Sequence, residues 1–168
     1  MKKLRYIFSF LLGSILMTGC FSYSFTGGDI GNAKTIQITA FRNVAPLIEP
    51  SLSQKFTQEL QDLFLRQTNL NSTNTDGDLR FEGEITGYSI VPMSATAQQR
   101  AAQNRLTITV NVRYFNKFIE KDNFDRPFSF FYDYPANAQL TGGTLDAAFK
   151  EILERITQNI FNASIGKW

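Results

Sequence analysis

The ten residues from Arg105 to Tyr114 alternate strictly between polar and apolar side chains, and no other pattern constrains the fold as strongly. Successive side chains of a β-strand point to opposite faces, so the pattern predicts a strand with one buried and one polar face. The polar residues include Arg105 and Arg113, and the apolar ones are Leu106, Ile108, Val110, Val112 and Tyr114. A strand of this kind belongs to an antiparallel sheet whose apolar face must be covered.

Three further segments have the spacing of strands. Residues 34–41 place apolar side chains at alternate positions. Residues 79–90 alternate until the phase slips before Tyr88, which indicates a bulge near Gly87, and Pro92 is expected to end this strand. Residues 124–134 alternate in aromatic residues, and Pro127 within them favours an edge strand.

Two segments have the 3.6-residue spacing of amphipathic helices. The first is expected to begin at Ser51, with Gln54 completing a capping box, and the second follows the break at Gly142-Gly143-Thr144. The predicted order is therefore β-α-β-β-β-α. We expect an α+β fold in which two amphipathic helices pack on one face of a four-stranded, mostly antiparallel sheet.

The N-terminal residues have the pattern of an export signal. Lys2, Lys3 and Arg5 precede an apolar run that is shorter than the ~20 residues needed to cross a bilayer. The ending Met17-Thr18-Gly19-Cys20 resembles the bacterial lipobox, which implies cleavage before Cys20 and lipid attachment to its sulfur. The alternative is a secreted protein with one unpaired cysteine.

This interpretation divides the chain into a lipoprotein signal peptide (1–19), a lipidated tether (20–33) and a single domain (34–168). Three of the seventeen basic residues precede Cys20, so the mature chain carries fourteen basic and fifteen acidic residues and has no bias towards nucleic acid. Lipoproteins retained at the inner membrane commonly have Asp after the cysteine, whereas this chain has Phe21. The resemblance therefore implies the outer membrane, with the domain on its periplasmic face.

The chain lacks the residues on which most catalytic sites depend. It has no histidine, and its one cysteine is assigned to lipid. Glu82 and Glu84 fit a solvated strand face better than a catalytic pair, and Asp76-Gly77-Asp78 lacks the later ligands of a calcium loop and is expected to be a turn. We expect no catalytic residues, no metal site and no cofactor, and hence no enzyme.

The lipobox and the order of elements together resemble the LptE family of lipopolysaccharide-assembly lipoproteins. The similarity is carried by Cys20–Phe25, Ile36–Asn43, Phe81–Ile85, Arg105–Val110 and Ile156–Trp168. It implies a plug inside the outer-membrane β-barrel LptD that helps to deliver lipopolysaccharide, and direct lipopolysaccharide binding. The alternative is a periplasmic lipoprotein that modulates another envelope machine, such as a peptidoglycan-synthase activator or a secretion-pore lipoprotein. Three consecutive strands favour LptE.

Two sets of residues are candidates for binding. Arg100, Arg105 and Arg113 have the forked guanidinium groups that suit lipid A phosphates, although ordinary surface arginines would give the same pattern. Phe131 extends an aromatic run on the expected edge strand, where a partner would cover it. The alternative there is a packed core strand with only Phe131 outside.

Overall fold

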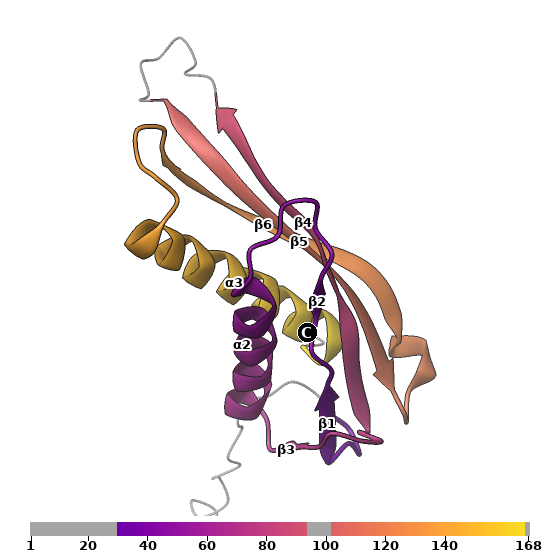
Figure 1. Cartoon of the computed structure of the whole chain (residues 1–168). Coiled ribbons are helices and arrows are strands. Elements are labelled where there is room, and N and C mark those ends of the chain that lie inside the picture. Colours follow the sequence, from indigo (N-terminus) through magenta and orange to yellow (C-terminus); the bar gives the residue numbers. More distant parts are fainter. Residues whose placement is uncertain (1–29, 94–101, 167–168) are drawn as a thin grey trace, which may run out of the picture.

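The computed structural model describes residues 30–93 and 102–166, which form one sheet with two helices packed on one of its faces. Figure 1 shows α2 (Leu52–Gln67) and α3 (Gly142–Ser164) on the same side of the sheet. The predicted α+β class and the placement of both helices on one face are therefore confirmed. Cys20 and Arg100 lie outside the described residues.

Three long antiparallel strands make up most of the sheet: β4 (Leu79–Met93), β5 (Gln103–Asn116) and β6 (Phe124–Pro135). The short strands β1 (Thr35–Ile38) and β3 (Asn71–Ser72) give the order β3-β1-β4-β5-β6, and β2 (Arg42–Asn43) also pairs with β4. These three short strands are parallel to their neighbours, so the six-stranded sheet is mixed. The predicted four strands missed β2 and β3, because two residues are too few to show a period.

The predicted bulge in β4 is present, since the register with β5 shifts between Ile85 and Gly87. The expected end of this strand at Pro92 is wrong: β4 continues to Met93, and Pro92 pairs with Asn104. No described strand pairs with the other side of β4 at this point, so the missing N–H of Pro92 removes no ladder hydrogen bond. Pro127 lies in β6, which is an edge strand as predicted.

Both helices lack the expected side-chain caps. Ser51 flanks α2, but its hydroxyl donates to the Glu49 carboxylate at 3.0 Å and makes no capping bond. Helix α3 begins at Gly142 and not after the expected break, with Thr141 in the capping position and no side-chain cap. Tertiary packing of the apolar stripes therefore stabilises these helices more than their ends do.

A chain of aromatic contacts joins the helices to the sheet. The ring of Phe64 on α2 lies 4.8 Å from Phe81 on β4 and 5.1 Å from Phe161 on α3, measured between ring centroids. Phe81 in turn stacks on Tyr114 of β5 at 4.7 Å. All four rings are buried or nearly so, and offset or tilted pairs of this kind add to the hydrophobic stabilisation of the core.

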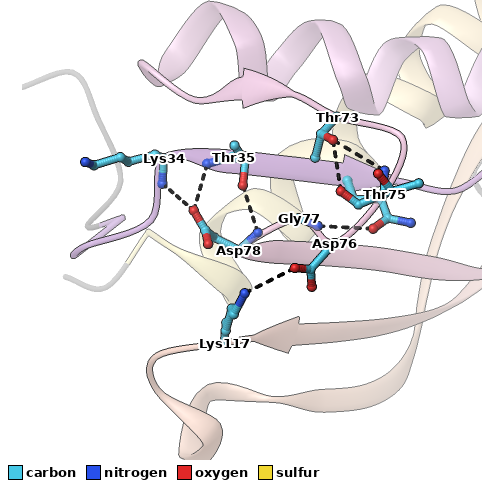
Figure 2. Close-up of polar contacts among 9 residues, drawn as sticks. Lys34, Thr35, Thr73, Thr75, Asp76, Gly77, Asp78 and Lys117 are labelled. Carbon is cyan, nitrogen blue, oxygen red and sulfur yellow. Dashed lines mark hydrogen bonds and ion pairs between the residues drawn. The ribbon is translucent and has the colours of Figure 1, made fainter.

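The start of β1 is fixed to the start of β4 by the Asp78 carboxylate (Figure 2). One of its oxygens accepts hydrogen bonds from the backbone N–H groups of Lys34 and Thr35, at 2.9 and 3.1 Å. The Asp78 N–H donates to the Thr35 hydroxyl at 3.0 Å, and the Gly77 N–H donates to the Gln37 amide oxygen at 3.2 Å. The bend at residues 76–78 thus orders a parallel strand pair, which explains why this acidic stretch need not bind a metal.

Candidate interaction surface

The face of the sheet opposite the helices is formed by the three long strands β4, β5 and β6. On β5 the apolar residues of the alternating pattern are buried, whereas the intervening residues are partly exposed on this opposite side. We call this side the polar face; its side chains on β4, β5 and β6 include Glu82, Glu84, Arg105, Thr107, Thr109, Asn111, Arg113, Asp125, Ser129, Phe131 and Asp133.

Arg105 is held by two neighbours on β6. Its Nε and Nη2 donate to the two carboxylate oxygens of Asp133 at 2.7 and 2.8 Å, and its guanidinium carbon lies 3.6 Å from the ring centroid of Phe131. The bidentate hydrogen bond with Asp133 raises the pKa of Arg105, and the same bond lowers the pKa of Asp133. Both side chains remain about one-third exposed, at 31% and 29%, so a ligand can reach them.

Two other cations of this face, Arg113 and Arg42, are also paired. Nε of Arg113 donates to the Glu82 carboxylate at 3.2 Å, and Arg42 donates to Glu84. Arg105 and Arg113 lie eight residues apart on β5, which corresponds to about 27 Å of strand. They therefore do not converge on one small group, and their role in ligand binding stays a prediction.

Phe131, the predicted partner contact, lies on the polar face with 41% of its surface exposed. It is therefore accessible to a partner, although its ring also supports Arg105 through the stacking contact. Its role as an interface residue also stays a prediction.

Arg80 belongs to this face and was not singled out from the sequence. Its guanidinium carbon lies 4.7 Å from the ring centroid of Phe115, its cross-strand neighbour on β5. The Nε of Arg80 is buried and has no hydrogen-bond partner in the described part of the chain. The contact depends on the register between β4 and β5, which a periodic pattern does not specify.

No three His, Cys, Asp or Glu side chains in residues 30–93 and 102–166 are grouped so that they could hold a metal ion. Within the same ranges, neither helix has the length and apolar character needed to cross a membrane.

The family model described as LptE, lipopolysaccharide-assembly, matches residues 33–164, which is most of the chain. This chain belongs to the LptE family. No curated protein matches the LptE chain by sequence.

Two solved structures share the fold of this LptE chain. Protein CT253 from Chlamydia trachomatis has a TM-score of 0.55 at 8% identity and covers 80% of this chain and 99% of its own. An uncharacterised lipoprotein B from Nitrosomonas europaea has a TM-score of 0.51 at 12% identity and covers 84% and 88%. At these identities the likeness supports the fold alone.

Family membership makes the chain a lipopolysaccharide-assembly lipoprotein, of a family that is not enzymatic. The resemblance drawn from the lipobox and the order of elements is therefore confirmed at the level of the family.

Proposed function

We propose that this protein is anchored by lipid on Cys20 at the periplasmic face of the outer membrane, where it plugs or supports an LptD-type β-barrel. In this position it assists lipopolysaccharide transport to the outer leaflet. The observation that carries the proposal is the LptE match over residues 33–164, which includes both helices and all three long strands. The lipobox-like ending at Cys20 supports the membrane anchor.

The polar face suits a domain enclosed by a hydrated protein wall. Most of its charges are paired within the sheet, for example Arg105–Asp133 and Arg113–Glu82, so the domain brings few uncompensated charges into an interface. Phe131 adds an exposed aromatic side chain of the kind enriched at protein contacts.

Lipid A phosphates are the proposed ligands of Arg105, with Arg100 and Arg113 as further contacts. Arg105 is held rigid by Phe131, so little side-chain entropy is lost when a phosphate binds. A phosphate must, however, displace or share the hydrogen bonds that Asp133 accepts. Binding through such a site should weaken as salt concentration rises.

The proposal is tested by purifying the full chain from outer membranes through a tag placed after Trp168. We expect an LptD-type barrel to be recovered with it and to be identified by mass spectrometry. Recovery of a peptidoglycan synthase or a secretion pore in place of a barrel would support the alternative, a lipoprotein that modulates another envelope machine.

A further inference from the structure

Along the far half of β4, one side pairs with no strand in the described part of the chain. On that side β1 pairs with Leu79–Phe81 and β2 with Glu84–Ile85, and the last backbone bond runs from the Val44 N–H to the Ile85 carbonyl at 3.0 Å. From Gly87 to Met93, the pairing of β4 within the described residues is with β5 alone. We call the uncovered side of residues 86–93 the open edge.

Two residues direct their backbone groups into the open edge. The Ile108 carbonyl on β5 faces β6, where it accepts a hydrogen bond from the Ser129 hydroxyl at 3.1 Å. Leu106 lies two residues earlier and has the same orientation. Tyr88 and Ile90 are their respective partners on β4, so the N–H and C=O groups of these two residues point away from β5 and into the open edge.

The open edge lacks the charged side chains that commonly protect sheet edges. Residues 86–93 read TGYSIVPM and include no charged side chain, and Pro92 stands near their end. The opposite edge strand, β6, contains Asp125, Arg126, Pro127 and Asp133. The open edge therefore has a bulge and one proline but none of the charged side chains that guard β6 against pairing with another strand.

Exposed apolar side chains gather at the same place. Ile90, Val91 and Met93 on β4 are 40%, 51% and 38% exposed. The loop that follows β2 runs beside β4 in Figure 1, and its exposed apolar residues are Val44, Leu47 and Ile48. These make up six of the nine large apolar side chains that the described part of the chain exposes. Ile90 points to the helix-covered face and Val91 and Met93 to the polar face, so apolar side chains flank the open edge on both faces of the sheet.

The open edge combines unpaired backbone groups with exposed apolar side chains, and this combination indicates which kind of molecule can bind there. Water satisfies the Tyr88 and Ile90 backbone but leaves the apolar side chains hydrated, whereas a lipid acyl chain covers those side chains and leaves the backbone groups unpaired. An extended polypeptide strand does both. The adjoining loop contributes one charged residue, Glu49, whose carboxylate already bonds Ser51, so the strand that fits is uncharged.

The open edge is too small to hold two copies of this chain together by itself. Residues 86–93 form a ribbon roughly 25 Å long and about 5 Å wide. This is much less than the ~800 Å² that each partner buries in a stable complex. The strand therefore belongs to a protein that also contacts this chain elsewhere.

We propose that the open edge accepts an uncharged, extended strand of the protein partner, which pairs with Tyr88 and Ile90 and continues the sheet beyond β4. The inference rests on the proposed function for the identity of that partner, an LptD-type barrel. It assigns the docking of the partner backbone to β4, whereas Phe131 would contact the partner from the polar face.

The first test compares Ile90→Pro with Ile90→Val in the full chain. The proline removes the Ile90 N–H from the open edge without removing a bond to β5, whereas valine keeps the N–H and a similar side chain. We expect Ile90→Pro to lower barrel recovery by at least about tenfold relative to Ile90→Val, while both purified proteins keep a cooperative melting transition. Equal recovery with the two variants would overturn the inference.

The second test needs no mutation and decides the matter if Ile90→Pro fails to fold. Amide hydrogen exchange is measured on the wild-type chain, alone and in its purified complex with the barrel. We expect exchange at Tyr88 and Ile90 to slow by about a hundredfold or more in the complex. Unchanged exchange at both amides would overturn the inference, as would equal slowing by lipopolysaccharide alone or by self-association at high protein concentration.

These outcomes separate the inference from the proposed function. If the wild-type chain recovers no barrel from outer membranes, the proposed function fails, and the inference about its partner fails with it. If the barrel is recovered but Ile90→Pro and the two amides behave as wild type, only the open edge is excluded.

Discussion

Arg105 and Asp133 lie opposite each other on β5 and β6 and share two hydrogen bonds of 2.7 and 2.8 Å. The pair neutralises the Arg105 guanidinium on the polar face in the absence of ligand. Asp133 therefore competes with any phosphate for the same guanidinium donors. The predicted role of Arg105 can therefore be tested with two substitutions that should change lipopolysaccharide affinity in opposite directions.

Removing the charge of Asp133 should strengthen lipopolysaccharide binding, whereas reversing the charge of Arg105 should weaken it. Asp133→Asn keeps the shape of the side chain and removes its charge, so we expect affinity to rise by about two- to tenfold at low salt. Arg105→Glu should reduce affinity, and the difference between the two variants should shrink as salt rises. Equilibrium binding of purified lipopolysaccharide measures both effects.

Arg113→Glu is the matched control for this experiment, because Arg113 lies on the same strand and face but about 27 Å away. We expect it to have a smaller effect than Arg105→Glu. If wild-type and Arg105→Glu proteins bind equally at low salt, Arg105 is not part of the site.

The long elements of the fold could be predicted from periodicity, because each repeats its pattern several times. The strand around Arg105–Tyr114 shows five alternating pairs, and the phase slip before Tyr88 located the bulge. Strands β2 and β3 consist of two residues each, and they exist because the backbone of β1 and β4 offers hydrogen bonds there. No local pattern encodes such tertiary pairing.

The contacts of the polar face could be predicted only in part. The alternation placed Arg105 and Arg113 on a solvated face, but their pairing with Asp133 and Glu82 depends on strand register. The capping box at Ser51 failed because the nearby Glu49 carboxylate takes the hydroxyl instead. The open edge could not be recognised before it was known which strands flank β4.

Phe131→Asp tests the predicted contact between the polar face and the partner. Phe131 is 41% exposed in the free domain, so the substitution should lower the melting temperature only slightly, through the lost contact with the Arg105 guanidinium. In the complex it would bury an uncompensated charge, and we expect barrel recovery to fall by about tenfold or more. Phe131→Leu keeps an apolar side chain and should retain most of the recovery. Undiminished recovery with Phe131→Asp would exclude this residue from the interface.

Asp78 should make folding stability depend on acidity. The hydrogen bond that its carboxylate accepts from the Lys34 backbone N–H holds the pKa of this carboxyl below the ordinary 3.8, so the folded state favours the charged form. The contribution is fully present above the unfolded pKa and is lost as pH falls through the lower folded value. Urea unfolding of Asp78→Asn should therefore show a loss of about 1 kcal/mol at pH 7 and a smaller loss at pH 3. Equal losses at both pH values would contradict this origin.

Gly83 on β4 has no room for a side chain. A Cβ at this position would overlap the Asn111 carbonyl on β5 and approach the Phe41 ring within 2.7 Å. We expect Gly83→Ala to destabilise the domain by about 2 kcal/mol or more, because backbone and a buried ring must both shift. Gly143→Ala is the control: nothing lies within 4 Å of a Cβ there, and alanine favours the helix. Thermal melts in which both variants match wild type would contradict the crowding at Gly83.

Cys20 is the expected site of lipid attachment, and the whole proposed location depends on it. Cys20→Ser removes the only thiol of the chain, and we expect either an uncleaved precursor or a domain released from membranes. A covalent acyl chain contributes about 0.8 kcal/mol per buried methylene, so no exposed side chain of the domain replaces the anchor. Fractionation of membranes and intact-mass measurement follow the change, with Ser22→Ala as a control that keeps the thiol. If Cys20→Ser protein is processed normally and still fractionates with the outer membrane, the lipid anchor is excluded.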